Sequence, residues 1–83
     1  MKLRYFAWVR ERIGHAEEDV DVPGDVSSVA DLIAWLASRD EGYAAAFAEP
    51  DVIRAAIDHE HVDHSTPIAA AGEIAFFPPM TGG

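Results

Sequence analysis

The chain has 83 residues, of which 49% are hydrophobic and 25% are charged, and this balance predicts one small globular domain and excludes a disordered chain. Its 6 Lys and Arg against 15 Asp and Glu give a formal net charge of −9, which disfavours nucleic acid and anionic membranes as partners and suits either a basic protein surface or solubility alone. Because the chain has no cysteine, disulfides, thiolate metal sites and a cysteine nucleophile are excluded.

Alternating side chains open the sequence. Over residues 2–9 they alternate with a period of two, with Leu3 and Tyr5 on one face and Phe6 and Trp8 on the other. That period predicts a strand. Because Phe6 and Trp8 are apolar, we expect both faces of this strand to be covered towards its end.

A second strand is expected to complete a hairpin with the first. Residues 10–13 predict a short helical turn or loop, which Gly14 closes. Residues 17–22 predict the second strand, because valines alternate with acidic residues there. The Pro-Gly pair at 23–24 is typical of a turn and should end it.

Residues 28–39 predict the main helix. Ser28 with Asp31 three residues later resembles a capping box, in which the Ser side chain accepts a hydrogen bond from the backbone of the first turn. The Asp-Glu-Gly sequence at 40–42 should end this helix, and the alanine-rich residues 43–48 predict a second, short one. The apolar residues of the main helix form one stripe that would pack across a sheet: Val29, Leu32, Ile33 and Leu36.

The C-terminal half predicts three more strands. The first covers residues 52–58, a tight turn at 59–60 leads into a short strand at 61–63, and the last strand covers residues 73–77. The order is therefore strand, strand, helix, strand, short strand, strand. It predicts an α+β roll, with a mixed sheet of four to five strands and one main helix packed across it.

The last six residues, 78–83, read Pro-Pro-Met-Thr-Gly-Gly. The prolines lack N–H donors, so they should end the sheet and favour an extended backbone. The glycines carry no Cβ, so they leave the terminal carboxylate unhindered and can pass through a narrow channel. At most, these residues span about 20 Å, which is enough to reach a neighbouring subunit. We therefore expect a folded domain over residues 1–77 and a flexible tail over 78–83, the alternative being a frayed end of no consequence.

Four segments carry a resemblance to a known family. They are Phe6-Ala7 and Arg10-Glu11 near the start, Pro67-Ile68, and residues 72–83 at the end. Together with the element order and the terminal Gly-Gly, they resemble the ubiquitin-like, or β-grasp, small subunits of molybdopterin synthase. The resemblance covers the whole chain. Its most specific part is the Phe-Pro-Pro-x-x-Gly-Gly terminus, and it implies a β-grasp roll.

The resemblance also implies a function, that of a sulfur carrier for molybdenum cofactor biosynthesis. The Gly83 carboxylate would be adenylated by a ubiquitin-activating-type adenylyltransferase and then converted to a thiocarboxylate. The thiocarboxylate would donate sulfur to cyclic pyranopterin monophosphate within molybdopterin synthase, a heterotetramer of two small and two large subunits. AMP is then only a transient acyl-adenylate, and no cofactor is bound permanently.

Gly83 is the predicted reactive residue, and Gly82 gives access to it. Phe76 and Phe77 alternate along the last strand, so one should enter the core and the other should face the opposite side. Core packing is the simpler role for either ring, but by resemblance Phe77 is the exposed anchor that both partners use. The residues predicted to bind partners are Phe77, Pro78, Pro79, Met80, Thr81 and His61.

Three histidines, His59, His61 and His64, cluster with acidic residues around the predicted turn. A weak metal site is conceivable there, but the spacing matches no known site, and we predict that no metal is bound. A solvated turn is one alternative. By resemblance this hairpin forms part of the partner surface, and His61 is then an interface residue.

Other functions stay open from the sequence. A serine–histidine–acid order, a phosphate-binding loop and an HExxH motif are all missing, so we expect a subunit of an enzyme and no catalysis by the chain alone. The alternatives are a related carrier that supplies sulfur for thiamin or cysteine synthesis, and a non-catalytic ubiquitin-like binding module. No apolar run approaches the roughly 18 residues of a membrane span, and no signal-peptide pattern precedes the first strand. We expect a cytoplasmic protein.

Overall fold

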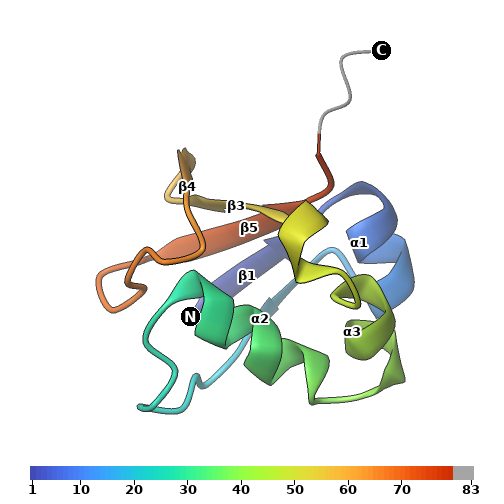
Figure 1. Cartoon of the computed structure of the whole chain (residues 1–83), viewed down its shortest axis with the longest axis horizontal. Helices are drawn as coiled ribbons and strands as arrows, with labels where there is room; N and C mark the ends of the chain where they lie inside the picture. Colours follow the sequence, from blue (N-terminus) through green and yellow to red (C-terminus); the bar gives the residue numbers. More distant parts are fainter. Residues whose placement is uncertain (80–83) are drawn as a thin grey trace.

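The computed structural model describes residues 1–79 and shows one mixed sheet with helices packed on one side of it (Figure 1). Its strands lie in the order β2-β1-β5-β3-β4, which confirms the predicted α+β roll. In chain order the elements are β1 (Lys2–Tyr5), α1 (Ala7–Ile13), β2 (Glu17–Asp19), α2 (Val29–Ala37), α3 (Glu41–Ala46), the 3₁₀ turn η1 (Pro50–Val52), β3 (Arg54–Ile57), β4 (Glu60–Val62) and β5 (Glu73–Phe77).

The two central strands, β1 and β5, run parallel, and the other neighbouring pairs are antiparallel. The register places Phe76 between Tyr5 on one side and Ala55 on the other. All three are buried, so this row lies on the inner face, the one that the helices cover. Because side chains alternate along a strand, the residues directly before and after these three in each strand point to the outer face.

The inner face and α2 together form the core. Tyr5, Ile74 and Phe76 are at most 1% exposed, and Figure 1 shows α2 and α3 on the same side of the central strands. The Ser28 hydroxyl accepts a hydrogen bond of 3.1 Å from the backbone N–H of Asp31, as the capping pattern predicted. None of the helices within residues 1–79 is long and apolar enough to cross a bilayer. The predicted stripe of α2 is buried throughout: Val29, Leu32, Ile33 and Leu36.

The prediction that the first strand extends to residue 9 is wrong, because β1 ends at Tyr5. The Phe6 N–H still donates to the Phe76 carbonyl over 3.1 Å, but the Phe6 carbonyl already accepts from the N–H groups of Val9 and Arg10. At Ala7 the backbone takes a φ of 52° and turns into α1. Val9 is buried and fits both a strand and a helix pattern, so the alternation extended the predicted strand too far.

Residues 40–42 begin α3, whereas the sequence pattern predicted only that they end the main helix. Asp40 is the N-cap, and its carboxylate accepts a hydrogen bond of 3.2 Å from the Tyr43 N–H. Gly42 lies against α1, where an added Cβ would come within 2.9 Å of the Arg12 carbonyl oxygen. Glycine is therefore required here by the close approach of two helices.

Two further strands are shorter than predicted. β2 ends at Asp19, and β3 begins only at Arg54 because Pro50–Val52 forms η1. β3 ends at Ile57 because Asp58 and His59 have φ values of 48° and 74°. Two consecutive residues with positive φ are typical of a two-residue hairpin turn, and this turn leads directly into β4.

Candidate functional site

The end of β5 brings two of the predicted partner-binding residues together on the outer face. The rings of His61 and Phe77 meet edge to face, with centroids 5.1 Å apart and an angle of 60° between their planes. They come from β4 and β5, and the strand between them, β3, carries Ala56 opposite His61. A small side chain at this position leaves room for the two rings to meet above it. Their role in binding a partner stays a prediction.

The two phenylalanines of β5 face opposite ways, as their alternation predicted. Phe76 is fully buried, stacked on Tyr5 at 6.2 Å between ring centroids and set edge-on to Phe47 at 5.4 Å. Phe77 is only half-buried and lies on the outer face. Phe76 therefore holds the end of β5 in the core, while Phe77 is available at the surface.

Phe6 joins this surface, although the sequence pattern predicted that its face would be covered. Among residues 1–79 it is the only large hydrophobic residue that is exposed, with 40% of its surface accessible to solvent. Its N–H bonds to Phe76, so it follows β1 beside the end of β5. It has the same parity as Lys2 and Arg4, and that parity could have placed it on the solvent side. We call Phe6, His61 and Phe77 the outer aromatic surface.

The tail leaves the domain next to this surface. β5 ends at Phe77, and Pro78 and Pro79 follow it in no regular secondary structure, which is expected because prolines cannot continue the hydrogen-bonded ladder. The predicted roles of Met80, Thr81, Gly82 and Gly83 fall outside the described residues. What the structure contributes is the starting point of the tail, directly beside Phe77.

The three clustered histidines have separate environments. His61 packs on Phe77, and His59 occupies the turn before β4. The His64 Nε2 atom lies 2.8 Å from the Ile53 carbonyl oxygen. Within residues 1–79, no group of three or more His, Asp or Glu side chains could hold a metal ion. The part of the histidine cluster that bears on the site is therefore His61.

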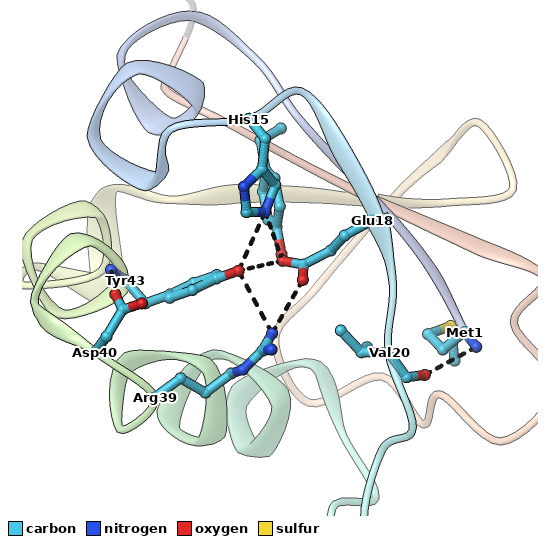
Figure 2. A network of polar contacts seen from close by, with 8 residues as sticks. Met1, His15, Glu18, Val20, Arg39, Asp40 and Tyr43 are labelled. Carbon is cyan, nitrogen blue, oxygen red and sulfur yellow. Dashed lines mark hydrogen bonds and ion pairs between the residues drawn. The ribbon is translucent and has the colours of Figure 1, made fainter.

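A polar cluster around Glu18 lies on the inner side of the sheet (Figure 2). The hydroxyl groups of Tyr5 and Tyr43 both donate to Glu18 Oε2, Tyr5 over 2.7 Å. Arg39 donates to Glu18 Oε1 over 3.2 Å, and His15 Nε2 lies 3.1 Å from Oε2. The cluster joins β1, β2 and α3 to the residues that follow α2.

Burial and hydrogen bonding act in opposite directions on the pKa of Glu18. Partial burial raises that pKa, but hydrogen bonds from the surrounding Tyr, His and Arg side chains outweigh it and lower the pKa to about 2. Burial, with Glu18 as the next cause, raises the pKa of Tyr43 to about 12. The pKa of Tyr5 is raised further for the same reasons. Glu18 is thus a carboxylate and both tyrosines are neutral donors at neutral pH.

This cluster predicts a pH dependence of stability. The folded pKa of Glu18, about 2, lies below its ordinary value of 4.5. Its contribution is therefore complete above about pH 5 and is lost as the pH falls towards 2, with a size of up to about 3 kcal/mol. Glu18→Gln should lower the free energy of unfolding at pH 7 and reduce its decline between pH 5 and 2. Urea titrations of both proteins would measure this; parallel declines would contradict it.

The sequence analysis did not identify Glu18 as a residue that stabilises the fold, although the alternation of side chains indicates that it points inward. It shares its parity with Val20, which is buried, so alternation along the second strand directs Glu18 inward as well. Its partner Tyr5 stacks on Phe76. The cluster therefore supports the strand that carries the tail and stands apart from the outer aromatic surface.

The chain is similar to known proteins along its whole length. The ThiS family pattern matches residues 3–83. A curated relative, the molybdopterin synthase sulfur carrier subunit of Escherichia coli, strain K12, is 32% identical over 83 residues, which cover 100% of this chain and 99% of that protein. This match extends through the Gly-Gly terminus.

Solved structures with the same fold include two archaeal proteins. Small archaeal modifier protein 1 of Haloferax volcanii superimposes with a TM-score of 0.71 at 28% identity, over 96% of this chain and 97% of that one. A Pyrococcus furiosus protein described as a molybdopterin converting factor, subunit 1, gives a TM-score of 0.73 at 26% identity, over 95% of each chain. These likenesses confirm the ubiquitin-like β-grasp fold.

Proposed function

The chain belongs to the ThiS family and is a sulfur carrier of that type, and from this premise we propose that it is the small, sulfur-carrying subunit of a molybdopterin synthase. The observation that carries the proposal is the full-length relationship to the E. coli sulfur carrier subunit. The structure also supports the proposal, because β5 is the last element and the tail therefore begins beside the outer aromatic surface.

The proposed chemistry takes place at the Gly83 carboxylate. A C-terminal carboxylate is ionised at neutral pH and is a poor acyl donor, because its oxygen is a poor leaving group. Attack of this carboxylate on the α-phosphate of ATP forms an acyl-adenylate and releases pyrophosphate. A sulfide equivalent then attacks the acyl carbon and displaces AMP, which leaves a thiocarboxylate. Its sulfur is a soft nucleophile, comparable to a cysteine thiolate.

In this proposal two partners use the same tail in turn. A ubiquitin-activating-type adenylyltransferase forms the acyl-adenylate, and the large synthase subunit receives the sulfur for cyclic pyranopterin monophosphate. The role of this chain is to present its C-terminal carboxylate to each partner. Gly82 and Gly83 enter a narrow channel of the partner, and Phe77 and His61 bind at the entrance of that channel. Pro78 and Pro79 favour an extended tail, and Met80 and Thr81 enter the partner together with the glycines.

The quaternary arrangement that we propose is a heterotetramer with two copies of each synthase subunit, formed in the cytoplasm. The relationship to a synthase subunit supports a large-subunit partner. Phe6 extends the surface available to such a partner, since it lies exposed beside the end of β5.

Reconstitution tests the pathway. The thiocarboxylated chain, mixed with the large synthase subunit of its own organism and cyclic pyranopterin monophosphate, should yield molybdopterin, measured as its fluorescent oxidation product. The unmodified chain is the matched control and should yield none. If sulfur instead passes only to a thiazole synthase or a cysteine synthase, the chain is one of the related carriers. If the tail is never activated, it is a binding module.

A further inference from the structure

Three basic side chains lie on the outer face of the sheet, and they have different surroundings. The strand register places Lys2, Arg4 and Arg54 on this face. Arg4 is shared between two acids, with Glu17 at 3.9 Å and Glu73 at 4.0 Å. The charge of Arg4 is thus more than balanced by carboxylates of the same sheet, so a partner that covers Arg4 need not supply a counter-charge for it.

Arg54 differs because no acidic side chain among residues 1–79 forms an ion pair with it. It is exposed and directly opposite Phe77 in the register of β3 and β5. It also lines a hollow at the β4 edge together with His61 and Asp63. A guanidinium that has no ion-pair partner among residues 1–79 therefore lies beside Phe77 and His61 of the outer aromatic surface.

A partner that covers this surface would take Arg54 out of water. Burying an unpaired charge is strongly unfavourable, so a stable complex needs a counter-charge at this point. The guanidinium carries N–H donors in a rigid fork that matches a carboxylate in two parallel hydrogen bonds. The group that best satisfies Arg54 in a covered interface is therefore an Asp or Glu side chain.

We propose that the large subunit docked on the outer aromatic surface places a carboxylate against Arg54. The inference rests on the proposed function and specifies how that partner is recognised. A chain of net charge −9 attracts basic surfaces in general. An acidic residue of the partner opposite Arg54 would have the opposite charge to the one that this attraction predicts. Such a reversal selects the correct partner and fixes the position of Phe77 at the mouth of its channel.

The test compares Arg54→Gln and Arg54→Lys with Lys2→Gln, by calorimetric titration of the large synthase subunit into each chain. We expect Arg54→Gln to weaken binding by about 10- to 100-fold. Arg54→Lys should recover only part of this, because an ammonium group lacks the fork. Lys2 is exposed on the same face at the far end of β1, so its variant should stay within about twofold of wild type.

The outcomes separate this inference from the function on which it rests. If the wild-type chain binds the large subunit and Arg54→Gln binds equally well or more tightly, the carboxylate contact is wrong while the carrier function stands. If Lys2→Gln weakens binding as much as Arg54→Gln, the effect is general charge and the specific contact is also wrong. A wild-type chain that binds no large subunit overturns both. Equal thermal midpoints would show that all variants are folded.

Discussion

Removing Gly83 is expected to abolish sulfur transfer and to leave the fold intact. The reacting acyl carbon belongs to Gly83, and a tail shortened by one residue ends about 3.3 Å short of the position where the reaction takes place. A displacement of only 1 Å can cost about 100-fold in rate, so transfer to the pterin should fall below detection. Stability should not change, because the hydrophobic core that residues 1–79 form runs from Leu3 to Phe76.

Two measurements check this expectation. Molybdopterin formation from the shortened chain should be absent, and the thermal midpoint should move by less than about 2 °C. Lys2→Gln is a useful control, since Lys2 is exposed at the far end of β1 from the tail and its replacement should retain transfer. A large drop in the midpoint on deleting Gly83 would instead mean that the terminus is packed structure. Undiminished transfer would remove Gly83 from its proposed role.

The two phenylalanines of β5 should give opposite results when each is replaced by alanine. Phe76→Ala removes a fully buried ring that stacks on Tyr5, so it should lower the free energy of unfolding by about 3 to 5 kcal/mol. In a domain of this size that corresponds to a fall of more than about 12 °C in thermal midpoint. Phe77→Ala removes a half-buried ring on the outer face and should cost about 1 kcal/mol of stability.

Binding should show the reverse order. Phe77→Ala should weaken the complex with the large subunit by about 30-fold or more, because an aromatic ring at the centre of an interface often dominates its affinity. Phe76→Ala, measured well below its midpoint, should bind within a few-fold of wild type. If both variants lose stability equally, Phe77 is a core residue. If Phe77→Ala binds the large subunit as tightly as wild type, Phe77 does not belong to the docking surface.

Local patterns in the sequence were sufficient to predict features that depend on residue spacing within a single helix or strand. The stripe and cap of α2 follow from spacing within the helix, and β5 covers the predicted residues 73–77. The opposite orientation of Phe76 and Phe77 follows from the period of a strand. These features place the start of the tail and Phe77, one of the residues proposed to bind a partner, so this part of the candidate site was predictable.

Features that depend on contacts between distant segments were not predictable in the same way. The turn at Ala7 has a φ of 52°, which alanine does not favour by itself, and it is held by packing of α1 against the rest of the fold. The proximity of Arg54 and Phe77 depends on β3 pairing with β5, and alternation alone does not give the order of strands in a sheet. For this reason Phe6 and Arg54 appear in the site only with the structure.

The most direct test of the account is the intact mass of the chain after incubation with ATP, a sulfur source and the adenylyltransferase of its organism. The expected product is a chain in which one oxygen of the Gly83 carboxylate has been replaced by sulfur, and a fragment spectrum should place the change at the last residue. Without ATP the mass should stay unchanged. A mass that never changes under these conditions, with an enzyme shown to be active on its own carrier, would contradict the sulfur-carrier function.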